Sequence, residues 1–166
     1  MRNVQQRVID APIEVVGPIV DTVSGPDDKV WPAHWPPITL DRGLEVGSKG
    51  GHGPIRYSVS EYEPGRRVRF VPAPGLGLAG YHEFTVTPQP NNRSLLTHVI
   101  EAKLYGRMRV LWPLAILWIH EAVLQDLLDK VERNATGTLT GEPARWSPWV
   151  RTLRRLSAPR GAKLPR

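Results

Sequence analysis

Five histidines are the side chains of this sequence best suited to transfer a proton or bind a metal ion near neutral pH. They are His34, His52, His82, His98 and His120. None of them is spaced i, i+4 on a predicted helix or i, i+2 on a predicted strand, and no carboxylate completes a helical His-x-x-x-His set. The sequence has no cysteine, which excludes thiolate ligands, a thiol nucleophile and a disulfide scaffold. We therefore predict no metal site.

Two of the histidines share a predicted strand face with apolar residues. His82 lies two residues before Phe84 and faces the protein interior if Phe84 does, because alternate side chains of a strand point to the same side. His98 has the same relation to Ile100. Such inward imidazoles could orient a polar ligand group or act as acid and base. The commoner alternative is a hydrogen-bonded structural histidine, and the sequence leaves both readings open.

Tyr57 and two tryptophans complete the candidate site. Tyr57 shares a strand face with Ile55 and Val59, so it is either a polar anchor for a ligand or a core tyrosine whose hydroxyl reaches water. Trp112 and Trp118 are six positions apart on a predicted helix and face different sides. One can line an interior while the other packs elsewhere, and core packing is the default for both. No catalytic residue is assigned. The candidate ligand-binding residues are Trp35, Tyr57, Phe70, His82, Phe84, His98, Ile100, Trp112 and Trp118.

Two glycine-rich segments resemble cofactor loops without their context. Residues 75–80 match G-x-G-x-x-G, but the dinucleotide fingerprint needs a following helix and residues 81–86 predict a strand. Residues 47–53 lack the Gly-Lys-Ser/Thr of a phosphate-binding loop and predict a mobile turn. We expect no cofactor.

The first quarter of the chain predicts one strand, short helices and a loop. Residues 3–9 alternate weakly and predict a strand, after which Asp10-Ala11-Pro12 is a helix-start signal. A short helix over 12–20 and a second turn or short helix over 27–31 are expected. Residues 31–37 hold three prolines and two tryptophans, a composition that predicts an apolar loop.

The middle of the chain predicts strands, and one long helix follows. Apolar and polar residues alternate in 55–60 and again in 67–70, on either side of a Glu63-Pro64-Gly65-Arg66 turn, which indicates a hairpin. Further strands are predicted at 38–44, 81–87 and 93–105. Residues 108–131 change to helical spacing, and Pro113 near the first turn predicts a helix that begins around Leu111.

These elements predict an α+β fold, and at this point the chain resembles a known family. The resemblance is to the START-related SRPBCC superfamily, near its polyketide cyclase/dehydrase-like branch, and it covers residues 1–134. The element order and the terminal helix carry it, together with the following segments: Trp31-Pro32 to Trp35-Pro36-Pro37, Gly53-Pro54-Ile55-Arg56-Tyr57 with the glycine-rich turn before it, and Glu63-Pro64-Gly65-Arg66-Arg67.

The resemblance implies a helix-grip fold and a ligand class. In that fold a curved antiparallel sheet of six to seven strands wraps around a long C-terminal helix, with two short helices after the first strand. An apolar cavity between sheet and helix holds a hydrophobic molecule such as a lipid or a polyketide. The alternative function is a polyketide cyclase-like or dehydratase-like enzyme that uses His82, His98 and Tyr57 for proton transfer.

The net positive charge of the chain lies in its C-terminal part. The predicted domain, residues 1–134, is followed by a basic, proline-rich tail, residues 135–166. The tail has seven Lys and Arg against one acid, Glu142, and therefore carries all of the formal net charge of +6. A fold that binds nucleic acid carries its basic excess along a groove or sheet of the body. We expect no specific nucleic-acid partner.

The tail predicts a short amphipathic helix over 148–157. Ser147-Pro148 is an N-cap followed by proline at the first helical position. Ten residues are too few to form a stable helix alone in water, so this helix must dock on something. Trp146 and Trp149 with the arginines of the helix suit weak contact with an anionic membrane, whereas docking on the chain's own domain or in a homodimer is the alternative.

Length and hydropathy limit the overall class. With 166 residues, of which 40% are apolar, the chain can bury the core of one domain. The N-terminal residues lack the continuous apolar segment of a secretory signal. The longest apolar run, residues 110–119, contains Pro113 and falls short of the roughly 20 residues that span a bilayer. We expect a cytoplasmic protein without a transmembrane helix.

Overall fold

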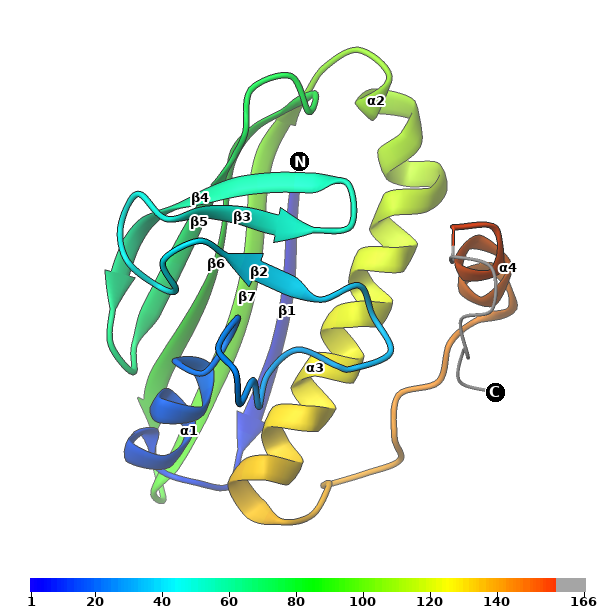
Figure 1. Cartoon of the computed structure of the whole chain (residues 1–166). Helices are drawn as coiled ribbons and strands as arrows, with labels where there is room; N and C mark the ends of the chain where they lie inside the picture. Colours follow the sequence, from blue (N-terminus) through cyan, green and yellow to red (C-terminus); the bar gives the residue numbers. More distant parts are fainter. Residues whose placement is uncertain (158–166) are drawn as a thin grey trace.

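A seven-stranded antiparallel sheet forms the body of the protein (Figure 1). The computed structural model describes residues 1–157, so the final basic residues of the predicted tail lie outside the described part of the chain. The spatial order of the strands is β1-β7-β6-β5-β4-β3-β2. Their bounds are β1 (Arg2–Ile9), β2 (Ile38–Leu40), β3 (Lys49–His52), β4 (Ile55–Glu63), β5 (Arg67–Pro72), β6 (Leu78–Gln89) and β7 (Arg93–Leu104).

A long C-terminal helix lies across one face of this curved sheet (Figure 1). It runs without a break through α2 (Met108–Leu111), a π-helical turn η1 (Trp112–Ile116) and α3 (Leu117–Thr136). The short helix α1 (Ile13–Val20) follows β1, and α4 (Pro148–Ser157) lies in the tail. The predicted α+β fold, in which a curved antiparallel sheet of six to seven strands holds a long C-terminal helix, is confirmed.

The structure corrects two details of the predicted element order. Of the turn or short helix expected over 27–31, the structure shows turns, so the second short helix that the resemblance implied is not formed there. The segment expected to be a flexible connection contains β3, which pairs with both β2 and β4. Its two glycines give no alternating pattern, so the sequence did not indicate a strand. A Cβ atom on Gly50 would lie 1.8 Å from the carbonyl oxygen of Thr39 in β2. Only glycine lets the neighbouring strand approach this closely.

The helix begins earlier than predicted because a π turn accommodates its proline. α2 begins at Met108, and Pro113 lies in η1 rather than at the helix start. The N–H of Leu117 closes the π turn by donating to the carbonyl of Trp112. Proline lacks an N–H donor, and a wider turn relieves its clash with the preceding turn.

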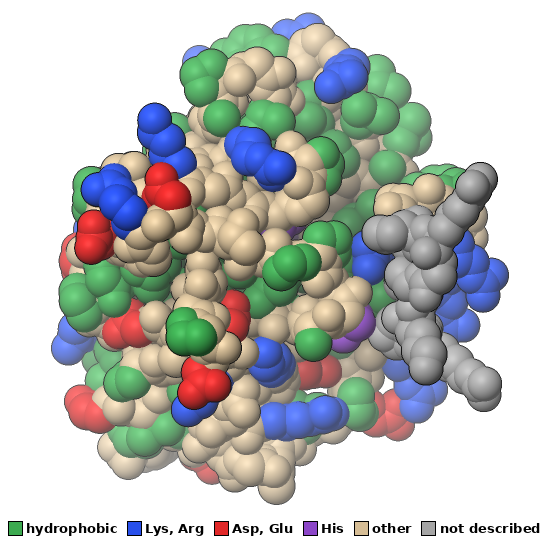
Figure 2. All heavy atoms as spheres, viewed as in Figure 1, with side chains coloured by type: hydrophobic (Ala, Val, Ile, Leu, Met, Phe, Trp, Pro, Cys, Tyr) green, Lys and Arg blue, Asp and Glu red, His purple; other side chains and the backbone are tan. Residues whose placement is uncertain are grey.

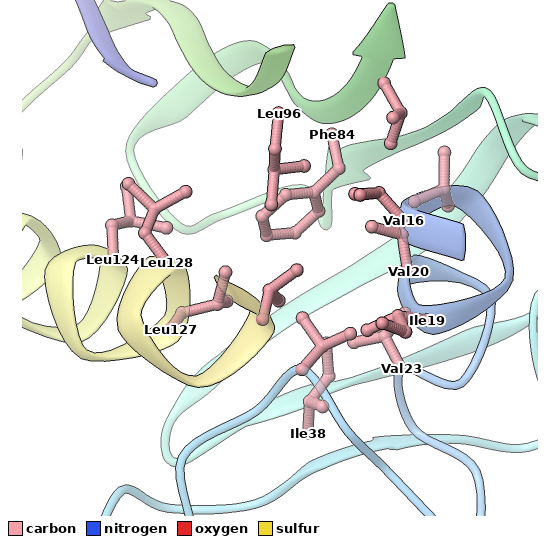
Figure 3. Close-up of a cluster of buried hydrophobic side chains, with 14 of the residues drawn as sticks. Val16, Ile19, Val20, Val23, Ile38, Phe84, Leu96, Leu124, Leu127 and Leu128 are labelled. Carbon is pink, nitrogen blue, oxygen red and sulfur yellow. The ribbon is translucent and has the colours of Figure 1, made fainter. Parts of the chain in front are cut away.

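The main core lies between α1, α3 and the part of the sheet that carries Phe84 and Leu96 (Figure 3). Phe84 and Leu96 project from β6 and β7 toward three leucines of α3 and toward the apolar face of α1 (Figure 3). The α3 leucines are Leu124, Leu127 and Leu128, and all three are buried. This packing holds the C-terminal half of the long helix on the sheet.

A polar seam joins the edge strand β1 to α3. Arg7 donates hydrogen bonds to the carboxylates of Asp129 and Glu132, the second at 2.9 Å. Gln125 donates to Gln5 at 2.8 Å. The weak alternation of β1 in the sequence follows from this seam, because alternate β1 side chains meet polar groups of the helix instead of apolar core.

The tail docks on its own domain. α3 ends at Thr136, and Gly137 adopts a left-handed conformation with φ of 78°, so the chain turns back along the helix. In α4, Val150 and Arg154 are buried. The guanidinium of Arg154 lies over the Trp35 ring at 4.3 Å and donates to the carbonyl of His34 at 2.9 Å. Among the predicted docking partners of the tail, the structure therefore shows the domain itself.

Candidate functional site

Five polar rings converge between the sheet and the N-terminal half of the long helix. We call this group the histidine cluster. Its members come from four strands and one helix, and the strands bring them together because their registers align on one face of the sheet. The histidine cluster consists of His52 (β3), Tyr57 (β4), His82 (β6), His98 (β7) and His120 (α3).

The strand pairing sets the positions of the sheet members. His82 lies opposite Phe70 on one side and opposite Ile100 on the other, and Phe84 lies opposite His98. Directly opposed residues of antiparallel strands bring their side chains into contact. The predicted inward orientation of His82 and His98 follows from this register.

The rings touch one another in a continuous series. The centroid of Tyr57 lies 5.9 Å from that of His52 and 5.0 Å from that of His82. The His98 ring lies 5.6 Å from His82 and 5.1 Å from His120. The atoms His98 Nε2 and His82 Nδ1 are 3.4 Å apart, a distance at which one imidazole can donate to the other. The cluster therefore extends from the sheet to the helix.

Aromatic side chains enclose this polar series. Phe70 is stacked on His82 with centroids 4.9 Å apart, and Phe84 meets His98 edge-on at 4.6 Å. At the two ends, Trp31 lies 5.0 Å from His52 and Trp112 lies 5.8 Å from His120. Phe84 also reaches into the main core (Figure 3), so the cluster is held by rigid packing on that side.

Burial keeps the four imidazoles of the cluster uncharged. Desolvation, with smaller effects from nearby charges, lowers the pKa of His52 and of His120 to about 4 and that of His82 to about 3. The pKa of His98 is lowered well below 6.5 for the same reason. Burial raises the pKa of Tyr57. At neutral pH the cluster is therefore made of neutral imidazoles and one protonated phenol.

Three polar atoms of the cluster have no hydrogen-bond partner among the described residues. They are Tyr57 Oη, His98 Nδ1 and His120 Nδ1, and each of these atoms is buried. Leaving a buried donor or acceptor unpaired costs about 1–3 kcal/mol. Three such atoms in one group are what a site for a polar ligand group or for ordered water requires.

The structure brings together seven of the nine predicted site residues. Tyr57, Phe70, His82, Phe84 and His98 belong to the cluster or contact it, Ile100 is buried opposite His82, and Trp112 contacts His120. The other two lie apart from the cluster. Their positions follow from the tail and from the outer face of the helix.

Trp35 and Trp118 are placed elsewhere. Trp35 is buried under the tail, where its ring lies 5.0 Å from that of Trp146. Trp118 is 45% exposed, and its indole N–H donates to the carbonyl of Pro113 at 3.1 Å. Trp118 therefore does not line the interior, because the helical turn that points Trp112 inward points Trp118 outward, as their spacing predicted.

Sequence reasoning missed two members of the cluster. His120, which was not among the candidate residues, is half-buried, and it lies eight positions after Trp112, about two helical turns along the same side of the helix. That spacing was an available signal. His52 was assigned to a mobile turn, and only the pairing of β3 with β4 shows that it faces Tyr57. No local pattern indicates such a contact.

Two hollows lie outside the sheet–helix interior. One of about 730 Å³ separates α3 from the tail and the 32–34 loop, with Asp126 and Trp146 in its wall. The other, of about 300 Å³, lies beside Arg7 and the segment 139–142. Among the described residues, no group of three or more His, Asp or Glu side chains is arranged to hold a metal ion.

Solved structures with the same fold have very different sequences. A protein from Thermobifida fusca superposes with a TM-score of 0.61 and 14% identity, over 81% of this chain and 92% of that one. CalU16 from Micromonospora echinospora gives 0.57 and 14%, over 95% and 84%. An Arthrobacter aurescens protein gives 0.59 and 15%, over 87% and 92%. No protein-family model and no curated protein matches the sequence. The likeness establishes the fold.

Proposed function

We propose that this protein binds a small, largely apolar molecule between the sheet and the N-terminal half of the long helix. The histidine cluster contacts the polar group of that molecule. The observation that carries the proposal is the set of three buried, unpaired polar atoms, Tyr57 Oη, His98 Nδ1 and His120 Nδ1, in an interior otherwise walled by aromatic rings. The resemblance to the SRPBCC superfamily supports the same location.

The chemistry of the cluster selects neutral ligands. Tyr57 is protonated and can donate its hydroxyl proton, while each neutral imidazole offers one donor and one acceptor nitrogen. With all four histidines uncharged, the cluster has no positive charge to offset a buried carboxylate or phosphate. A carbonyl or hydroxyl group on an apolar skeleton fits these donors and acceptors best.

A binding experiment with matched variants tests this proposal. Hydrophobic ketones, alcohols and the corresponding carboxylic acids are titrated and followed by tryptophan fluorescence and native mass spectrometry. We expect neutral carbonyl or hydroxyl compounds to bind and the ionised acids to bind at least tenfold more weakly, about 1.4 kcal/mol. Tyr57→Phe and His98→Phe should weaken binding, whereas His34→Gln, outside the cluster, should not. Equal affinities for all four proteins would contradict the proposal.

The contact between His82 and His98 favours a second candidate, a cyclase-like or dehydratase-like enzyme. Two imidazoles 3.4 Å apart can pass a proton from one to the other. A base with a pKa of about 3 is, however, a weak proton acceptor at pH 7, since general bases work best with a pKa near the working pH. Binding is therefore the primary proposal. Turnover of a bound carbonyl compound that is lost in His82→Phe and retained in His34→Gln would establish the enzyme instead.

A further inference from the structure

The outer face of α2 and η1 carries an unusual number of exposed apolar side chains. Val110 is 59% exposed and Leu114 60%, and Leu111 and Trp118 lie on the same side of the helix. Hydrophobic atoms gather over this part of the molecule, with a Lys or Arg side chain among them (Figure 2). We call the surface formed by these four side chains, together with Trp149 and Leu156 of α4, the apolar surface.

The helix α4 adds further apolar side chains to this surface. The indole N–H of Trp149 donates to the carbonyl of Leu114 at 3.0 Å, which places the start of α4 against η1. Seven residues further on, Leu156 lies on the same face of α4 and is 81% exposed. The tail helix thus buries Val150 and Arg154 and adds its own apolar stripe to that of η1.

The indole N–H groups of this surface are already paired within the protein. Trp118 donates its indole N–H to the carbonyl of Pro113, and Trp149 donates to that of Leu114. These carbonyls belong to the π turn, where the regular helical hydrogen bonds are interrupted. In lipid an N–H group must find its acceptor within the protein, whereas in water it can bond to solvent. Both tryptophan rings can therefore enter an apolar medium without leaving a donor unpaired.

The stretch of chain that carries the helical half of this surface is basic. Arg107 and Arg109 are exposed at the start of the long helix, and Arg155 is exposed on α4. Residues 102–120 contain no Asp or Glu. In a symmetric dimer through this face, these arginines would lie near a second set of the same residues, which is repulsive. An anionic lipid surface instead attracts them.

We propose that the apolar surface docks on an anionic membrane, with the exposed side chains of η1 and α4 in the interfacial layer and the arginines at the lipid head groups. This docking goes beyond the proposed ligand binding and does not depend on it. The structure revises which tail residues are involved. Of the two tryptophans expected at a membrane, Trp149 remains at the surface, whereas Trp146 bonds to Asp126 at 2.9 Å.

The contact is peripheral because the rest of the helix is held in the core. By length and composition the helix Met108–Thr136 could cross a membrane, with a mean hydropathy of 1.3 in its most apolar window. Its C-terminal half packs on the sheet through Leu127 and Leu128, and Asp129 pairs with Arg7. Crossing a bilayer would break these contacts, so the helix lies at the membrane surface.

Vesicle binding tests this proposal. The full chain is sedimented with vesicles of phosphatidylcholine containing about one third phosphatidylglycerol, and with phosphatidylcholine alone. We expect binding to the anionic vesicles that falls severalfold in about 0.5 M NaCl. Val110→Glu with Leu114→Glu should reduce the bound fraction about tenfold, because glutamate opposes both the apolar and the electrostatic contact. Arg107→Gln with Arg109→Gln should reduce it at low salt.

Matched controls separate docking from misfolding and from dimerisation. Val46→Glu changes a valine with 61% exposure on a distant turn, and Lys49→Gln with Arg66→Gln removes two exposed cations elsewhere. Both controls should bind like the unmodified chain, and circular dichroism should be the same for all variants. Unchanged vesicle binding by Val110→Glu with Leu114→Glu would overturn the proposal. So would no vesicle binding at all, or a dimer that this variant converts to a monomer.

Discussion

At the scale of single residues, Asp126 connects three segments of the chain. Its Oδ2 atom accepts hydrogen bonds from Trp35 Nε1 at 2.7 Å and from Trp146 Nε1 at 2.9 Å, and it lies 2.8 Å from His34 Nε2. One carboxylate on α3 thus holds both the apolar loop before β2 and the tail. Trp35, predicted as a ligand contact, is instead part of this joint.

We predict that Asp126→Ala loosens the tail. Removing the carboxylate leaves the buried Trp35 indole and its two neighbours without their acceptor, and should lower the free energy of unfolding by about 2 kcal/mol. Urea denaturation measures this loss, and proteolysis after Arg145 should become faster. Asp27→Ala, at an exposed turn position, is the control. Equal stability and equal proteolysis of the two variants would contradict the role given to Asp126.

The neutral histidines predict a pH dependence of stability. In the folded chain the pKa values of His52, His82 and His120 lie at about 3–4, against 6.5 in the unfolded chain. Between pH 6.5 and 4 the unfolded state therefore binds more protons. The free energy of unfolding should fall as the pH is lowered through this window, by up to about 1.4 kcal/mol per pH unit for each histidine.

A variant that lacks two of these histidines separates their effect on stability from the titration of carboxylates. His82→Phe with His98→Phe keeps two aromatic rings in place but removes two protonation sites. Its free energy of unfolding, measured by urea denaturation from pH 8 to pH 4, should depend less steeply on pH below 6.5 than that of the unmodified chain. The same slope in both proteins would show that these imidazoles are not held neutral in the folded state.

At the scale of elements, β3 decides whether the histidine cluster is complete, because it carries His52 to Tyr57. Gly50→Ala would place a Cβ atom 1.8 Å from the Thr39 carbonyl oxygen and should push β2 away from β3. We expect a loss of about 2–4 kcal/mol in unfolding free energy, together with weaker ligand binding. Gly141→Ala, which meets no atom within 4 Å, should leave both quantities unchanged. Thermal melts measure the stability and the fluorescence titration measures ligand binding. A Gly50→Ala variant with unchanged stability and binding would refute the close approach of β2 and β3.

At the scale of the whole molecule, the described part of the tail, residues 137–157, is docked on a domain that has its own core. The main core is built from residues before Gly137, so a chain ending at Gly137 should fold. It should lose about 3 kcal/mol of unfolding free energy, since Val150 no longer covers the domain and Trp35 is uncovered. Urea denaturation of the shortened chain checks this value, and failure of that chain to fold would show that the tail belongs to the core.

Local patterns in the sequence were sufficient for most of the fold. Period-2 alternation located β4 and β5, the segments on either side of a Pro/Asn-rich turn were predicted as β6 and β7, helical spacing located the long helix, and Ser147-Pro148 located α4. These signals are local because each element must present one apolar face, whatever the rest of the chain does. β3 was not predicted, because a strand with two glycines shows no alternation of apolar and polar residues. The predicted start of the long helix was too late in the sequence, because a π turn tolerates Pro113 inside the helix.

The site depended on contacts that no local pattern records. The inward faces of His82 and His98 followed from the apolar residues beside them, and the opposite directions of Trp112 and Trp118 followed from helical geometry. That His52 and His120 join the same group was decided by strand pairing and by the crossing of helix and sheet, between residues up to 68 positions apart. The sequence by itself thus determined which faces are apolar. The tertiary structure decided which faces meet, because register and helix packing depend on the whole assembled sheet.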